Sequence, residues 1–94
     1  MRTKTRPFDP AKHLAALEAQ AEYISAALGT GAPAFIADSL GAVARARGMS
    51  QLARDTGLRR ESLYKALSAD GNPEFATIMK VAQALGVKLS AKVV

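Results

Sequence analysis

The chain contains no cysteine and only one histidine among its 94 residues. Missing thiols exclude disulfides and thiolate metal ligands, and a lone histidine leaves no set of side chains with metal-ligand spacing. We therefore predict a protein that holds no metal and needs no cofactor.

Long apolar runs are also absent. The longest stretches fall far short of the roughly 20 residues that a membrane helix needs. The basic start, Met1-Arg-Thr-Lys-Thr-Arg-Pro7, is not followed by the apolar core of a signal peptide. We predict a cytoplasmic protein without a membrane partner.

Catalytic patterns are missing too. His13 has no cysteine partner, and Gly29-Thr30-Gly31 lacks the Gly-Lys-Ser/Thr ending of a phosphate-binding loop. We predict that the protein is not an enzyme, and a surface role for His13 is the simpler interpretation.

Aromatic residues make up only 5% of the chain, although 49% of its residues are hydrophobic. Alanine supplies much of this content, which favours close-packed helices around a modest core. The length suits one domain, predicted over residues 9–94, after a flexible basic arm at residues 1–8. Small domains of this kind often gain stability by dimerising.

The formal net charge is +5. Basic residues gather between positions 45 and 65, where only Asp55 and Glu61 are acidic: Arg45, Arg47, Arg54, Arg59, Arg60 and Lys65. Clustered positive charge favours a polyanion such as nucleic acid, and a solvated basic face is the alternative. Arg45 and Arg47 either add to this attraction or are merely solvated.

Apolar spacing and helix-ending residues predict an all-α fold of five helices. Asp9 can cap a helix that ends at Gly29, and Pro33 can open a second that ends at Gly48. Ser50 is a natural N-cap for a short third helix ending at Thr56. The last two helices are predicted over about residues 60–68 and 75–85.

The last eight residues, Val-Lys-Leu-Ser-Ala-Lys-Val-Val, alternate apolar and polar side chains. Alternation is typical of a strand, and a lone strand needs a partner for its backbone groups. A short C-terminal strand would pair with a second subunit or another protein's sheet edge. A frayed terminus is the alternative.

Residues 49–68 have the pattern of a helix-turn-helix. Two short helices that cross steeply need a small residue at the crossing, Ala53, and a glycine in the turn, Gly57. The predicted core of this motif is Leu52, Ala53, Gly57, Leu58, Leu63 and Ala66.

The outward side of the second helix is polar, as a helix that enters the major groove requires. Arg60 can bind guanine through two hydrogen bonds, and Glu61 can accept one from a cytosine amino group. Lys65 lies on the same face as Glu61, and an intrahelical Glu61–Lys65 ion pair is the alternative for Lys65. The predicted base-reading residues are Arg60, Glu61, Ser62 and Lys65. The predicted phosphate-binding residues are Ser50, Gln51, Arg54, Arg59 and Tyr64.

These residues resemble the antitoxins of bacterial addiction modules, of the Xre/HigA-like helix-turn-helix family. The resemblance covers about residues 9–89, and its most telling runs are Arg47–Arg54, Gly57-Leu58, Arg60–Ser68 and Gly71-Asn-Pro73. It implies a five-helix lambda-repressor-like (Xre) domain that represses transcription as a homodimer on palindromic operator DNA. It also implies a partner, a RelE/HigB-like toxin that the antitoxin neutralises.

Two other functions compete with this hypothesis. A phage-type Xre regulator without a toxin shares every DNA-reading feature, and a toxin gene beside this one would separate the two. A helical interaction module that does not bind DNA explains the helices but not the polar side of residues 59–65.

Overall fold

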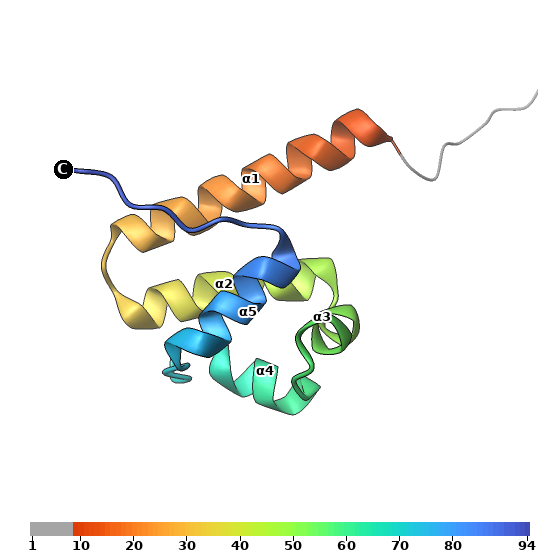
Figure 1. Ribbon diagram of the computed structural model, residues 1–94, viewed down its shortest axis with the longest axis vertical. Helices are drawn as coiled ribbons and strands as arrows, with labels where there is room; N and C mark the ends of the chain where they lie inside the picture. The colour runs from red at the N-terminus through yellow and green to blue at the C-terminus, as the bar shows by residue number, and fades with distance from the viewer. Residues whose placement is uncertain (1–8) are drawn as a thin grey trace, which may run out of the picture.

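Five α-helices make up the described part of the protein, residues 9–94 of a computed structural model (Figure 1). They are α1 (Pro10–Gly29), α2 (Pro33–Arg47), α3 (Met49–Thr56), α4 (Arg60–Ala66) and α5 (Phe75–Leu85). The all-helical prediction is confirmed. The predicted basic arm lies outside the described residues. No described helix has both the length and the apolar character that a membrane crossing demands.

Several helix ends form as the capping residues predict. The Asp9 carboxylate accepts hydrogen bonds from the backbone N–H groups of Ala11 and Lys12, at 3.0 and 3.5 Å. Pro10 occupies the first turn of α1, where a missing N–H does no harm. Gly86 ends α5 in the left-handed conformation, with φ of 74°.

Two predicted helix ends were wrong. Ser50 does not cap α3, because Gly48 is already its N-cap and its carbonyl accepts a hydrogen bond from the Leu52 N–H at 3.1 Å. Gly48 adopts φ of 109°, which lets the chain turn from α2 into α3 within one residue. The helix predicted to reach Ser68 ends at Ala66, since Leu67 leaves the helical region with ψ of 53°.

The C-terminal tail, residues 87–94, forms no strand in this single chain. The Val87 N–H closes the end of α5 by donating to the Ala82 carbonyl at 2.9 Å. The rest of the tail then runs along α1 (Figure 1). A strand is defined by pairing, and no other described segment of this chain is extended beside it.

The core lies where α2, α3, α4 and α5 meet, with the second half of α1 packed on top. Its members are almost wholly removed from solvent: Ile24, Leu40, Val43, Ala44, Met49, Leu52, Leu63, Leu67, Val81 and Leu85. Helices α1 and α2 pack against each other, and each carries a buried alanine, Ala27 and Ala37 respectively.

Arg47 is neither a solvated cation nor part of a cationic surface. Its Nε donates to the Gln20 side-chain oxygen at 2.7 Å, and its terminal nitrogen donates to the Leu85 carbonyl. Because Leu85 is the last residue of α5, this one side chain ties α1 and α5 to the end of α2. Arg45, two residues earlier on α2, is exposed.

Two glycines surround the carboxyl end of α4. A Cβ atom at Gly41, in the middle of α2, would overlap the Leu67 carbonyl oxygen. A Cβ atom at Gly71 would overlap the carbonyl oxygens of Lys65 and Ala66. Both contacts involve backbone, which cannot rotate aside as a side chain can. The position of α4 therefore depends on the absence of a side chain at these two residues.

We expect Gly41→Ala to lower the free energy of unfolding by about 1–3 kcal/mol. Alanine normally stabilises a helix interior by about 0.5–1 kcal/mol over glycine. A loss of stability on Gly41→Ala would therefore indicate the close contact with α4. Gly29→Ala is the matched control, because a Cβ there meets nothing within 4 Å. Urea denaturation followed by circular dichroism measures both, and equal stability of the two variants would contradict the close α2–α4 approach.

Candidate nucleic-acid interface

Helices α3 and α4 form a helix-turn-helix around a buried seam. Leu52 of α3 is 3% exposed and Leu63 of α4 is 1% exposed. Ala53, Leu58 and Ala66 are partly buried around them. The small side chain of Ala53 lies on the side of α3 that faces the core, where it leaves room for the second helix.

The turn between the helices is built by Thr56 and Gly57. The Thr56 hydroxyl donates to the Leu52 carbonyl at 2.8 Å and accepts from the Leu58 N–H at 3.2 Å. Gly57 follows with φ of 75°, in the left-handed region. From its sequence pattern, Thr56 is predicted only as a helix end. Its place directly before a helix-ending glycine is the signal that could have revealed this role.

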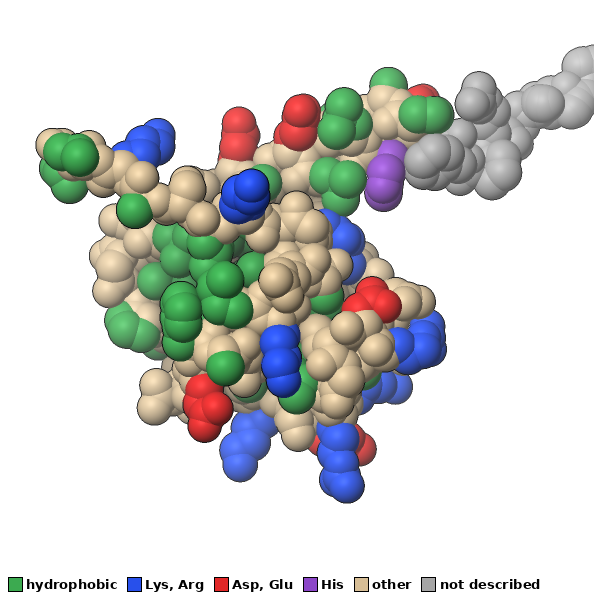
Figure 2. Space-filling model, in the orientation of Figure 1, with side chains coloured by type: hydrophobic (Ala, Val, Ile, Leu, Met, Phe, Trp, Pro, Cys, Tyr) green, Lys and Arg blue, Asp and Glu red, His purple; other side chains and the backbone are tan. Residues whose placement is uncertain are grey.

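The opposite side of the motif is open to solvent. All nine residues predicted to read bases or bind phosphate are exposed: Ser50, Gln51, Arg54, Arg59, Arg60, Glu61, Ser62, Tyr64 and Lys65. Figure 2 shows Lys and Arg side chains gathered at the lower edge of the molecule, where Figure 1 shows α3 and α4. The exposed side is therefore cationic as well as polar.

Glu61 and Lys65 occupy the outermost line of α4, opposite Leu63 and Leu67. They are four residues apart, which places them on one face of the helix. No ion pair joins them in the described chain, because none of their charged atoms approach within 4.0 Å. Both charges thus remain available to a partner.

Arg60 and Tyr64 form a stacked pair on the flank of α4. The guanidinium carbon of Arg60 lies 5.8 Å from the centre of the Tyr64 ring. A cation above an aromatic face gains about 0.5–1 kcal/mol at an exposed site. Contact with the ring restricts the directions in which the guanidinium can point.

A second polar network lies on α3. The Gln51 amide donates to Asp55 at 2.8 Å and accepts from Arg54, also at 2.8 Å. The Gln51 side chain is therefore oriented from both sides. The backbone N–H groups in the first turn of α3 have no partner within the helix, which is the arrangement that favours a phosphate oxygen.

The described residues offer no set of metal ligands. Residues 9–94 contain no group of three His, Cys, Asp or Glu side chains that could hold an ion. What the face can do is donate several hydrogen bonds, accept a few, and attract negative charge.

The comparisons with known proteins give the family. A model of the family described as "Probable addiction module antidote protein" matches residues 4–93, so the chain belongs to that family. An uncharacterised protein from Haemophilus influenzae is 46% identical over 92 residues, covering 98% of this chain and 95% of its own. No solved structure matches the chain.

Replacing Gly57 by alanine tests the geometry of the turn. We expect a loss of about 1 kcal/mol in the free energy of unfolding, since left-handed backbone disfavours a side chain by that amount. A steric clash is not the cause of this loss, because a Cβ at Gly57 meets nothing within 4 Å.

Gly57→Asn is the matched control, because asparagine tolerates this conformation better than alanine does. Denaturant melts of the two variants are compared. Stability that is higher for alanine than for asparagine would show that the turn is not left-handed.

Proposed function

We propose that this protein is the DNA-binding antitoxin of a type II toxin–antitoxin module. In this role it binds its operator as a homodimer, represses transcription from it, and neutralises a RelE/HigB-like toxin. Membership of the antidote family supports the antitoxin role. The resemblance of its helix-turn-helix to the Xre/HigA-like family supports the choice of toxin.

The main support for DNA binding is that α4 has one buried apolar side and one exposed polar side. Its Leu63 is 1% exposed, while every polar side chain of the helix is exposed. A helix presented in this way can enter the major groove, whose width admits one α-helix. The basic residues around it neutralise phosphates on either side of the groove.

Each group on the face has a matching partner on DNA. Arg60 is our candidate for paired hydrogen bonds to guanine, and Glu61 for accepting from a cytosine amino group. Ser62 and Lys65 complete the base-reading set. Five residues on the edges of the face, which would hold the motif on the backbone, form the phosphate set: Ser50, Gln51, Arg54, Arg59 and Tyr64.

We expect a homodimer because helix-turn-helix proteins commonly bind DNA as two-fold dimers. Two-fold related copies place two recognition helices in successive major grooves, about 34 Å apart. A palindromic operator then presents the same half-site to each copy.

The toxin needs a surface that DNA does not cover. Helix α1 lies on the far side of the molecule from α4 (Figure 1). Its first half extends beyond the body, and Leu14 is 55% exposed there although it continues the apolar stripe of Ile24. We assign the toxin to this half of α1.

Arg60→Ala should weaken binding to operator DNA by about 1–3 kcal/mol, and binding to random DNA much less, because a base contact is lost. Lys12→Ala removes the same charge from exposed α1 and is the control. Fluorescence anisotropy at one fixed salt concentration measures both. Equal losses on the two DNAs would contradict base reading by Arg60.

Antitoxin activity is tested by co-expression with the product of the neighbouring gene. The chain should restore growth to cells that the toxin arrests, and Arg60→Ala should do so equally well from an unrelated promoter. Leu14→Glu should lose protection while retaining operator binding, because only α1 is changed. Growth arrest that persists with the unchanged chain would contradict the toxin partner.

A further inference from the structure

The C-terminal tail presents an unpaired backbone edge. Among residues 9–94, no backbone or side-chain hydrogen bond involves any residue from 88 to 94. Figure 1 shows this segment as an open trace beside α1, without a helical turn. Seven successive residues thus carry N–H and C=O groups with no partner within the described part of the chain, and such an edge is a template for another extended segment.

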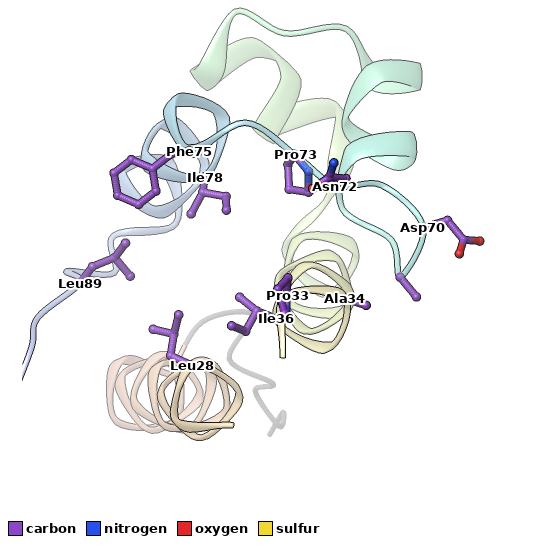
Figure 3. A pocket seen from close by; sticks show the side chains of 11 residues that line it. Leu28, Pro33, Ala34, Ile36, Asp70, Asn72, Pro73, Phe75, Ile78 and Leu89 are labelled. Atoms are coloured by element: carbon purple, nitrogen blue, oxygen red, sulfur yellow. The ribbon is translucent and has the colours of Figure 1, made fainter. Parts of the chain in front are cut away.

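Contacts at the start of the tail hold it in place. Val87 and Leu89 are half-buried, while Lys88 and Ser90 between them are exposed. Leu89 points into an apolar hollow of about 400 Å³ and faces Leu28, Ile36 and Ile78 across it (Figure 3). The alternation that the sequence shows is therefore expressed in the structure, although no strand forms.

We propose that two copies of this chain join through their tails, which pair as antiparallel strands centred on Ala91. The inference deepens the proposed function, on whose homodimer it rests, by naming the surface that joins the copies. Two-fold symmetry makes each tail both donor and acceptor, so one contact satisfies both edges.

Charge and length select this register. With Ala91 opposite its own copy, all seven residues from 88 to 94 pair, Leu89 lies opposite Val93, and Lys92 lies opposite Ser90. Centring on Ser90 would place Lys88 opposite Lys92 at two points of the ladder, and like charges directly opposite are unfavourable. Centring on Leu89 would shorten the ladder to residues 87–91, because Gly86 is the C-cap of α5 and already donates its N–H to the Gln83 carbonyl.

Exposed apolar side chains next to the tail support a partner on this side. Phe75 and Met79 of α5 are 69% and 37% exposed. Met79 lines a groove between α5 and residues 86–89 of the tail. A second copy brought in by the tails would cover this apolar surface.

The absence of cysteine makes disulfide trapping a clean test, because each variant then carries one thiol. Ala91→Cys should form the disulfide-linked dimer most efficiently, since directly opposite Cβ atoms in an antiparallel pair lie about 4.5–5.5 Å apart. Ser90→Cys and Lys92→Cys are matched controls. Each should link poorly to itself, yet a mixture of the two should link to each other.

A maximum at any position other than 91, or equal linking along residues 89–93, would overturn the proposal. A second measurement is sedimentation of the chain truncated after Leu89, which keeps both inward side chains of the tail. Its dimer dissociation constant should rise at least tenfold with unchanged helix content, and unchanged association would also overturn the proposal.

Neither the disulfide trapping nor the sedimentation uses DNA, so the tail contact and the proposed function are tested independently. Operator binding without the Ala91→Cys link would discard the tail contact and keep the proposed function. Formation of the Ala91→Cys disulfide without operator binding would keep the tail contact and discard the proposed function.

Discussion

The close approach of α4 to α2 at Gly41 is the contact on which the rest of the structure depends. The Leu67 carbonyl lies where a side chain at Gly41 would be, and Gly71 packs against the preceding carbonyls of the same helix end. Leu63 and Leu67 then point into the core at 1% and 0% exposure. Once that side of α4 is buried, the helix periodicity leaves Glu61 and Lys65 facing solvent. The candidate DNA-reading face is thus oriented by backbone packing.

The molecule divides its surfaces between different kinds of contact. Basic and polar groups lie on α3 and α4, while most of the exposed apolar groups lie on α1, on α5 and in the tail. Arg47 holds α1 and α5 together, because it joins both of them to the end of α2. The proposed partners, DNA, a second copy and a toxin, need such separation, since each must reach its surface without displacing another.

Much of the fold could be predicted because the relevant signals are local. Asp9, Pro10, Gly57 and Gly86 mark helix ends by their own conformational preferences, and the structure places helix ends there. The prediction that Ser50 caps α3 was wrong because Gly48 can also start a helix, and only the tight α2–α3 junction decides between the two residues. The roles of Gly41 and Arg47 could not be predicted, since each depends on residues more than 20 positions away. In the candidate site, the four-residue spacing of Leu63 and Leu67 indicates which side of α4 is exposed, but nothing in the sequence predicts the Arg60–Tyr64 stack.

One face, formed by the first turn of α3 and the outward side of α4, is our candidate for the surface that meets DNA. It can be mapped by NMR, from the amide chemical shifts during a titration with operator DNA. We expect the large shifts to fall between residues 49 and 66, with α1 and the tail little changed beyond what dimerisation causes. Shifts centred on α1, or a titration that leaves α4 unaffected, would contradict this expectation.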